Sequence, residues 1–317
     1  GPYASHDGFS VTDLSDVKHA IDWYALRGYF QLKVYNSFPP ELLADSVAYA
    51  HKRGLKVSGH VPAFIRAEDA LNQGFDELHH VNQLLLNFLA TDKTDTRTLE
   101  RFYLPAEKVA GMDFNAPEIL EFIERLKNQN IVVDPTLATF DFLKHRDGEV
   151  ADPYKAIAAN MPPDIVRSFK TGTMKIPDEQ TARRYEASYK KMVEFVGKLY
   201  RAGVPIVAGT DGLAGFTLHS ELELYVKAGL TPAQAIQVAT WNGAKYSNTL
   251  NDRGSITRGK LADLILVDGD PTKNIEDIRK VSAVITRGKL IYPNEINQAL
   301  GVKPFVKAPP KLIKLNE

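Results

Sequence analysis

Amphipathic helical segments alternate with short apolar runs over the first two hundred residues. Apolar residues at positions 42, 43, 47 and 50 share one helical face, so the sequence predicts a helix over 41–53 that ends at Gly54. The apolar run that follows is too short for another helix and predicts a strand. The same order recurs along the chain: predicted helices span 14–27, 41–53, 67–73, 117–129 and 181–202, and predicted strands span 30–35, 55–60, 75–81, 131–135 and 204–210. This alternation indicates an α/β protein with a parallel sheet or a (β/α) barrel.

Five predicted strands are fewer than the eight that close such a barrel. The residues before position 14 are too few to supply three more strand–helix units. Residues 139–180 interrupt the alternation with several prolines. We expect a helical excursion or lid here, because long loops at the carboxyl ends of barrel strands shape substrate sites.

The pattern changes after residue 248. Short apolar runs are separated by Gly-Lys and Asp-Gly turns, which predicts β-strands within 252–292 that pack away from the site. The expected organisation is therefore a barrel portion over 1–248, a small β module over 249–300 and a loosely attached Lys- and Pro-rich tail over 301–317.

Composition narrows the chemistry. Lys and Arg total 39 and Asp and Glu total 39, so no basic excess favours nucleic acid or an anionic membrane. The absence of cysteine excludes thiolate ligands, so any metal must be held by nitrogen and oxygen. No apolar run is long enough to cross a bilayer. The opening Gly1-Pro2 is typical of a protease scar, so we expect the natural N-terminus, and any targeting signal on it, to lie upstream; the compartment stays open.

Polar residues stand at the ends of the predicted strands. These are Lys33, His60, His79 or His80, Asp134 and Asp211. Strand ends meet at one mouth in a (β/α) barrel, so imidazoles and carboxylates converging there predict a metal site. Because strand side chains alternate, at most one of His79 and His80 points into the mouth.

Each residue also has a simpler interpretation. His60 could cap a helix from a loop, Asp211 could be only a turn residue, and Lys33 could be an edge-strand lysine that reaches water. The combination, in this order, is harder to explain without function.

Several motifs resemble the amidohydrolase superfamily, in its imidazolonepropionase-like and prolidase-like branch. The resemblance covers about residues 28–292 and is carried by these stretches: Leu32-Lys33-Val34-Tyr35, Val57-Ser58-Gly59-His60-Val61-Pro62, Gly74-Phe75-Asp76-Glu77-Leu78-His79-His80, Ala208-Gly209-Thr210-Asp211, Leu218-His219-Ser220-Glu221-Leu222, Ala239-Thr240-Trp241-Asn242-Gly243-Ala244 and Gly259-Lys260-Leu261-Ala262-Asp263-Leu264. The family usually reads Glu-His where this chain has His79-His80, so His80 matches the ligand and should face the mouth.

The resemblance implies a role for each strand end. Lys33 would be the carboxylated fourth-strand lysine that bridges two metals, His60 and His80 the ligands on strands five and six, and Asp211 the eighth-strand carboxylate that binds metal and moves the proton of the attacking water. The implied cofactor is one or two divalent ions, with zinc expected. Tyr35 and His219 are candidates for substrate contact. Without metal, Lys33 should pair with Asp211.

The family opens its barrel with a His-x-His pair on the first strand, and this chain contains no His-x-His. The resemblance thus implies a partial (β/α)8 TIM-type barrel, with strands 4–8 present and strands 1–3 missing, followed by part of a C-terminal β-sandwich. The implied activity is hydrolysis of an amide or other C–N bond, in a dipeptide or acyl-amino acid, by a metal-bound hydroxide. Alternatives are a lactonase or phosphotriesterase on the same barrel, or a truncated, non-catalytic fragment whose open barrel edge pairs with another chain, as in a homo-oligomer.

Overall fold

A four-stranded parallel sheet forms the centre of the protein. The computed structural model describes residues 8–307, so Gly1-Pro2 and the end of the predicted tail lie outside the described residues. Strands β1 (Gln31–Val34), β2 (Lys56–Gly59), β3 (Glu77–His79) and β4 (Val132–Asp134) pair side by side in chain order. The fifth predicted strand makes only one parallel bridge, between Ile206 and Val133. The α/β class with a parallel sheet is confirmed, whereas the described residues form an open sheet whose outermost strand is β1.

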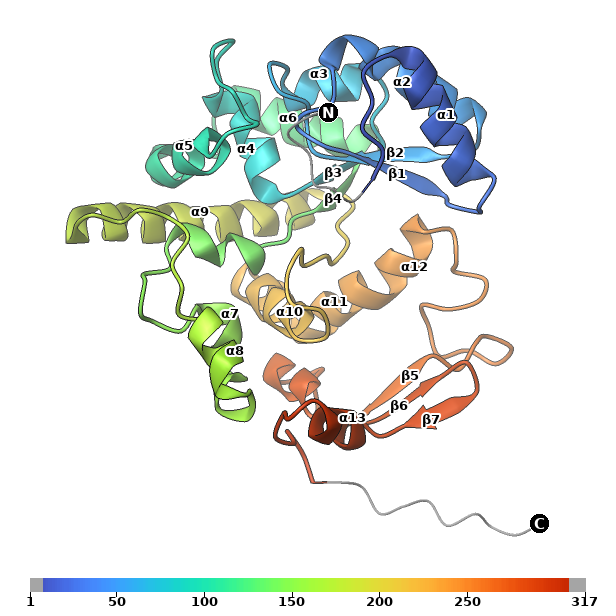
Figure 1. The fold of residues 1–317 in the computed structure, drawn as a ribbon, viewed down its shortest axis with the longest axis vertical. Coiled ribbons are helices and arrows are strands. Elements are labelled where there is room, and N and C mark those ends of the chain that lie inside the picture. Colours follow the sequence, from blue (N-terminus) through green and yellow to red (C-terminus); the bar gives the residue numbers. More distant parts are fainter. Residues whose placement is uncertain (1–7, 308–317) are drawn as a thin grey trace.

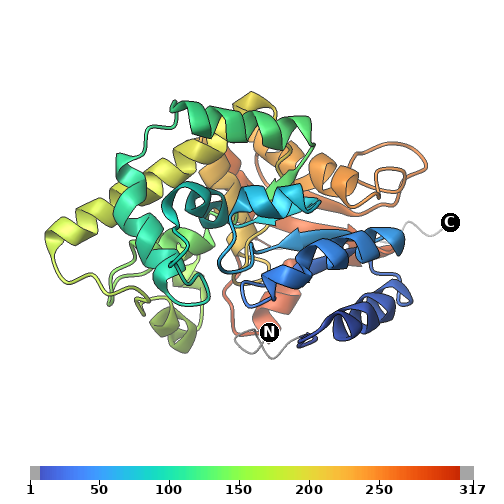
Figure 2. The same ribbon diagram turned by 90° about the horizontal axis from the view of Figure 1, so that it is seen from above.

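The predicted helices precede or follow these strands as expected. They are α1 (Leu14–Ala25), α2 (Leu43–Lys52), α3 (Ala67–Asn72), α6 (Pro117–Asn128) and α9 (Glu179–Ala202). Gly203 ends α9 with φ 90°, a left-handed conformation that glycine adopts without strain. Helices α1, α2, α3 and α6 lie together on one side of the sheet (Figures 1 and 2).

Other helices complete this part of the chain. They are α4 (Val81–Leu89), α5 (Glu100–Lys108), α10 (Thr217–Lys227), α11 (Pro232–Gln237) and α12 (Gly243–Tyr246), with short turns of 3₁₀- or π-helix at Pro40–Leu42, Val109–Gly111, Val238–Asn242 and Ile275–Arg279. Among the described residues, none of the helices combines the length and apolar character needed to cross a membrane.

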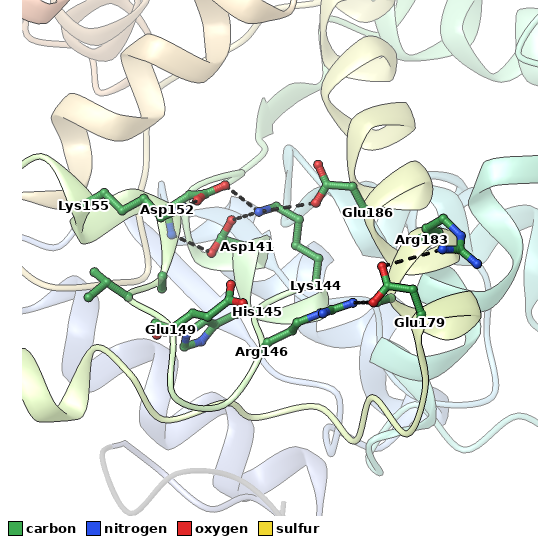
Figure 3. Close-up of a pocket in the computed structure, with 13 residues that line it drawn as sticks. Asp141, Lys144, His145, Arg146, Glu149, Asp152, Lys155, Glu179, Arg183 and Glu186 are labelled. Carbon is green, nitrogen blue, oxygen red and sulfur yellow. Dashed lines mark hydrogen bonds and ion pairs between the residues drawn. The ribbon is translucent and has the colours of Figure 1, made fainter.

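Residues 139–180 form the predicted helical excursion. It contains a 3₁₀ turn (Thr139–Leu143), α7 (Asp152–Lys155), a second turn (Ala158–Asn160) and α8 (Pro163–Ser168). Lys144 fastens the excursion to α9: its ammonium lies 2.8 Å from Asp141, 2.6 Å from Asp152 and 3.6 Å from Glu186 (Figure 3).

The C-terminal region carries an antiparallel sheet, as predicted. Strands β5 (Leu264–Val267), β6 (Val281–Thr286) and β7 (Lys289–Ile291) pair in order, and α13 (Pro293–Ala299), which the pattern did not reveal, follows them. Helices α10–α12 lie between this sheet and the parallel one (Figure 1). The prediction of β-strands packed away from the site is confirmed, and the described residues here form a single sheet. The division at residue 248 stays a prediction.

The two faces of the parallel sheet differ in chemistry. Val57, Leu78 and Val133 are buried among the helices. Side chains alternate along a strand, so the opposite face carries the neighbours of these residues. That inner face is polar: it presents Lys33, Ser58, Glu77, His79 and Asp134, which the strand register places side by side.

Candidate active site

Three predicted site residues meet at the carboxyl edge of the parallel sheet. His60 directly follows β2, His80 directly follows β3, and Asp211 follows the segment that bridges to β4. The rings of His60 and His80 lie 4.5 Å apart between centroids, and Nε2 of His80 lies 3.8 Å from Oδ2 of Asp211. The structure therefore brings these three side chains together although 131 residues separate His80 from Asp211 (211 − 80).

Both imidazoles are buried and each keeps one free nitrogen. His60 is 6% exposed and His80 is 3% exposed. Nδ1 of His80 hydrogen-bonds to the hydroxyl of Thr136 at 2.8 Å, but Nε2 of His80 and Nδ1 of His60 are buried without a hydrogen-bond partner. An unpartnered buried nitrogen costs about 1–3 kcal/mol, so this arrangement fits a ligand that the two rings share.

The imidazoles are held in their neutral form. Burial, and then the nearby charge of Lys33, lower the pKa of His60 to about 3. Burial and the neighbouring His60 hold the pKa of His80 well below its usual value. A neutral imidazole offers a nitrogen lone pair, which is the form that coordinates a metal.

Lys33 lies beside this group but does not behave as expected. It lines a pocket of about 810 Å³ together with Tyr35, His60 and Asp211. Its side chain is exposed, and within residues 8–307 no ion pair joins it to Asp211, so the expected pairing is wrong. The reason is its position on β1, the outermost strand, where a lysine reaches water without a partner.

The two candidates for substrate contact lie in different places. The ring of Tyr35 lies 4.3 Å from that of His60, at the wall of the pocket. His219 lies on α10, where burial and the charge of Arg279 lower its pKa to about 4. The structure therefore joins Tyr35 to the group and gives His219 other charged neighbours.

Alternation predicts that His79 points to the face opposite His80, and this prediction is wrong. Nε2 of His79 lies 2.9 Å from Oε1 of Glu77 on the inner face of the sheet, and its ring lies 5.9 Å from that of His80. The rule fails because β3 ends at His79, and His80 has φ 66° instead of an extended backbone.

Three contacting residues of the site share a left-handed backbone. His80, Thr136 and Asp211 have φ of 66°, 48° and 45°. Such a conformation costs about 1–3 kcal/mol for a residue other than glycine, and it is least favourable for a β-branched threonine. Strain that collects at one place is typical of functional sites.

Sequence reasoning missed two supporting residues, Thr136 and Glu221. Glu221 on α10 is fully buried, and its carboxylate accepts hydrogen bonds from the backbone N–H groups of Leu137 (2.9 Å) and Ala138 (2.6 Å). Burial raises the pKa of Glu221 to about 8. Glu221 thereby fixes the loop that follows β4 and carries Thr136. The only signal for Glu221 in the sequence was its place inside the motif that contains His219.

Comparison with known proteins places the chain in a family. Residues 29–291 match the Amidohydrolase family. The chain belongs to the amidohydrolase family. It is 38% identical over 114 residues to an imidazolonepropionase of Pyrobaculum arsenaticum, covering 34% of this chain and 28% of that protein. It is 39% identical over 85 residues to adenine deaminase 1 of Desulfotalea psychrophila, covering 27% of this chain and 13% of that protein.

Solved amidohydrolase structures share the fold. A Xaa-Pro dipeptidase with bound methionine in its active site superposes with a TM-score of 0.57 at 22% identity, over 89% of this chain and 59% of that one. A bottromycin amidohydrolase superposes with a TM-score of 0.67 at 20% identity, over 95% and 66%. This family member thus spans less than two thirds of the length of the relatives it matches.

Proposed function

We propose that this protein is a metal-dependent hydrolase of amide or other C–N bonds, with His60, His80 and Asp211 as metal ligands. The observation that carries the proposal is the pair of buried, unpartnered nitrogens, Nδ1 of His60 and Nε2 of His80, beside a carboxylate. Two neutral imidazoles and one carboxylate are a donor set that zinc accepts. The names of the imidazolonepropionase and adenine deaminase relatives support C–N chemistry.

A divalent metal, when bound, polarises the carbonyl of the substrate and supplies a water of lowered pKa. The remaining work falls to the side chains of this chain. Asp211 is the most exposed of the three, with 54% of its side chain accessible, so its free oxygen can take a proton and return it to the leaving nitrogen. Thr136 fixes the orientation of the His80 ring, and Tyr35 borders the space for the substrate.

We further propose that the four parallel strands, together with the segment that bridges to β4 at Ile206, correspond to strands four to eight of a (β/α) barrel. On this assignment Lys33 is the carboxylated bridging lysine, zinc is the metal, and the family's first-strand His-x-His pair is not among these 317 residues. The dipeptidase fold neighbour favours a dipeptide or acyl-amino acid as substrate.

An alternative is a non-catalytic role in which β1 pairs with another chain. The observation that favours it is the outermost position of β1, which leaves one strand edge unpaired in the described sheet. Metal content separates the two functions. After dialysis against zinc, the protein should retain more metal per chain than its His60→Gln, His80→Gln variant if the site is a catalytic centre, and the same amount if only the alternative holds.

The test of catalysis compares two isosteric variants. Asp211→Asn removes the proton acceptor and should lower the hydrolysis of a panel of dipeptides and acyl-amino acids by about 10²–10⁴-fold. Asp92→Asn changes an exposed aspartate in the loop after α4 and should leave turnover unchanged. Retained turnover in Asp211→Asn would remove Asp211 from the mechanism.

A further inference from the structure

A second cluster of potential ligands lies on the inner face of the parallel sheet. Glu77 and His79 stand two residues apart on β3, so both point to that face, and Asp134 on β4 is the register partner of His79. One oxygen or nitrogen from each of the three lies within 4.8 Å of those of the other two. Ligands held 2.0–2.3 Å from a common ion lie at most about 4.6 Å apart, so these three atoms are close to the separations that one ion requires.

The two carboxylates in this cluster each have an oxygen available for a metal ion. Gln31 on β1 donates a hydrogen bond of 3.1 Å to Oε2 of Glu77, which leaves Oε1 directed at Nε2 of His79. Oδ1 of Asp134 is buried and has no hydrogen-bond partner. A buried carboxylate oxygen without a donor is costly unless something else, such as a cation, satisfies it.

A second histidine–carboxylate pair near the same sheet, His51 and Asp76, has its contacting atoms satisfied within the protein. On the helix-covered side, His51 lies 2.8 Å from Oδ2 of Asp76. That oxygen also accepts a hydrogen bond of 2.7 Å from the backbone N–H of Val57, and no third carboxylate joins the described group. The inner cluster differs because it adds a third ligand whose oxygen is unsatisfied.

We propose that Glu77, His79 and Asp134 bind a divalent transition-metal ion such as zinc, manganese or cobalt at a site separate from His60, His80 and Asp211. One imidazole and two carboxylates favour these ions over calcium and magnesium, which prefer oxygen alone. Gln31 is the positioning residue of this site, because it holds the Glu77 carboxylate from outside. The site does not depend on the proposed hydrolytic function.

The experiment removes the first site in order to read the second. In the metal-free protein carrying both His60→Gln and His80→Gln, Co²⁺ is titrated and followed by its visible absorption. One bound Co²⁺ per chain is expected. Adding Glu77→Gln or Asp134→Asn should weaken binding beyond the roughly 10–100-fold that loss of a supporting residue costs. Adding His51→Gln is the matched control and should change nothing.

A second readout needs no further variant. In the same His60→Gln, His80→Gln protein, paramagnetic Co²⁺ should shift or broaden the imidazole NMR signals of His79 and leave those of His51 in place. Absence of Co²⁺ binding, binding unaffected by Glu77→Gln, or unperturbed His79 signals would each overturn the proposal. Loss of hydrolysis bears only on the first site, because these variants have already removed it.

Discussion

The imidazole pair and the centre of the Lys144 network, Lys144 and Asp141, are both nearly buried, but their polar groups are satisfied to different degrees. Around Lys144, one ammonium that is 10% exposed meets three carboxylates, and its pKa rises because Asp141 and Asp152 outweigh the effect of burial (Figure 3). At His60 and His80, two nitrogens meet no hydrogen-bond donor or acceptor. In the first group, Oδ1 of Asp141 also lacks a hydrogen bond, but the ammonium of Lys144 lies 2.8 Å away and pairs with its charge, and the group holds the 139–180 excursion to α9. The second is incomplete within the described chain and is the one that favours an external ligand.

The largest effect on stability is expected from replacing Lys144. Lys144→Met would leave the buried Asp141 carboxylate without a cation, and removing one partner of a buried pair costs about 3–5 kcal/mol of unfolding free energy. Urea unfolding measures the loss. The control is Lys190→Met, because Lys190 is exposed and pairs with the same Glu186 at 3.3 Å. It should cost at most about 1 kcal/mol, as exposed pairs do. Equal losses in the two variants would show that the network is not a structural clamp.

The next largest effect is a loss of stability in acid, which we expect from the imidazole pair. The folded-state pKa of His60 is lowered to about 3 and that of His80 is also depressed, whereas both start near 6.5 in the unfolded chain. The unfolded state therefore binds more protons as pH falls below 6.5, and the native state loses stability toward pH 3. The loss approaches about 1.4 kcal/mol per pH unit for each buried imidazole.

Urea unfolding of the metal-free protein between pH 6.5 and 5 checks this sign. His60→Gln combined with His80→Gln should flatten the profile over that interval. Parallel profiles for the parent protein and the double variant would contradict the assignment of buried neutral rings.

A smaller effect is expected at Thr136, whose hydroxyl hydrogen-bonds to the imidazole of His80. Thr136→Val keeps the side-chain shape but leaves Nδ1 of His80 without a partner, at a cost of about 1 kcal/mol. Zinc affinity should fall by about 10–100-fold, because the ring is no longer oriented. Thr136→Ser retains the hydroxyl and should restore the affinity. An unchanged affinity in Thr136→Val would mean that packing alone orients the ring.

The smallest stability effect belongs to Asp211, the exposed member of the site. Asp211→Asn should change the unfolding free energy by less than about 0.5 kcal/mol, since asparagine tolerates the left-handed backbone and the side chain is accessible. Thermal or urea unfolding tests this beside the activity assay. A large loss of stability would place Asp211 among the structural groups, with Lys144.

Much of the fold was predictable because its signals are local. Gly54, Gly74 and Gly203 end helices just before β2, β3 and the bridging segment, and each strand was predicted within a few residues of its observed bounds. The meeting of His60, His80 and Asp211 followed from the rule that parallel strands share one carboxyl edge. The extent of the sheet was not predictable, because closure depends on pairings that no single segment encodes.

The residues that were predicted wrongly or missed have positions that depend on the tertiary structure and not on the local sequence. Lys33 is exposed because β1 is outermost, which is a property of the whole sheet. The direction of His79 depends on one dihedral angle at the next residue, and Glu221 matters only because α10 packs beneath the loop after β4. Strand patterns contain none of this information.

The left-handed backbone at Thr136 sets stability and chemistry against each other. Glycine would relieve the strain at this position, so selection for heat resistance alone would favour it. The same change would delete the hydroxyl that holds His80. Thermostable descendants selected without regard to catalysis should therefore lose this threonine early, whereas a parallel library that is also selected for catalysis should keep it.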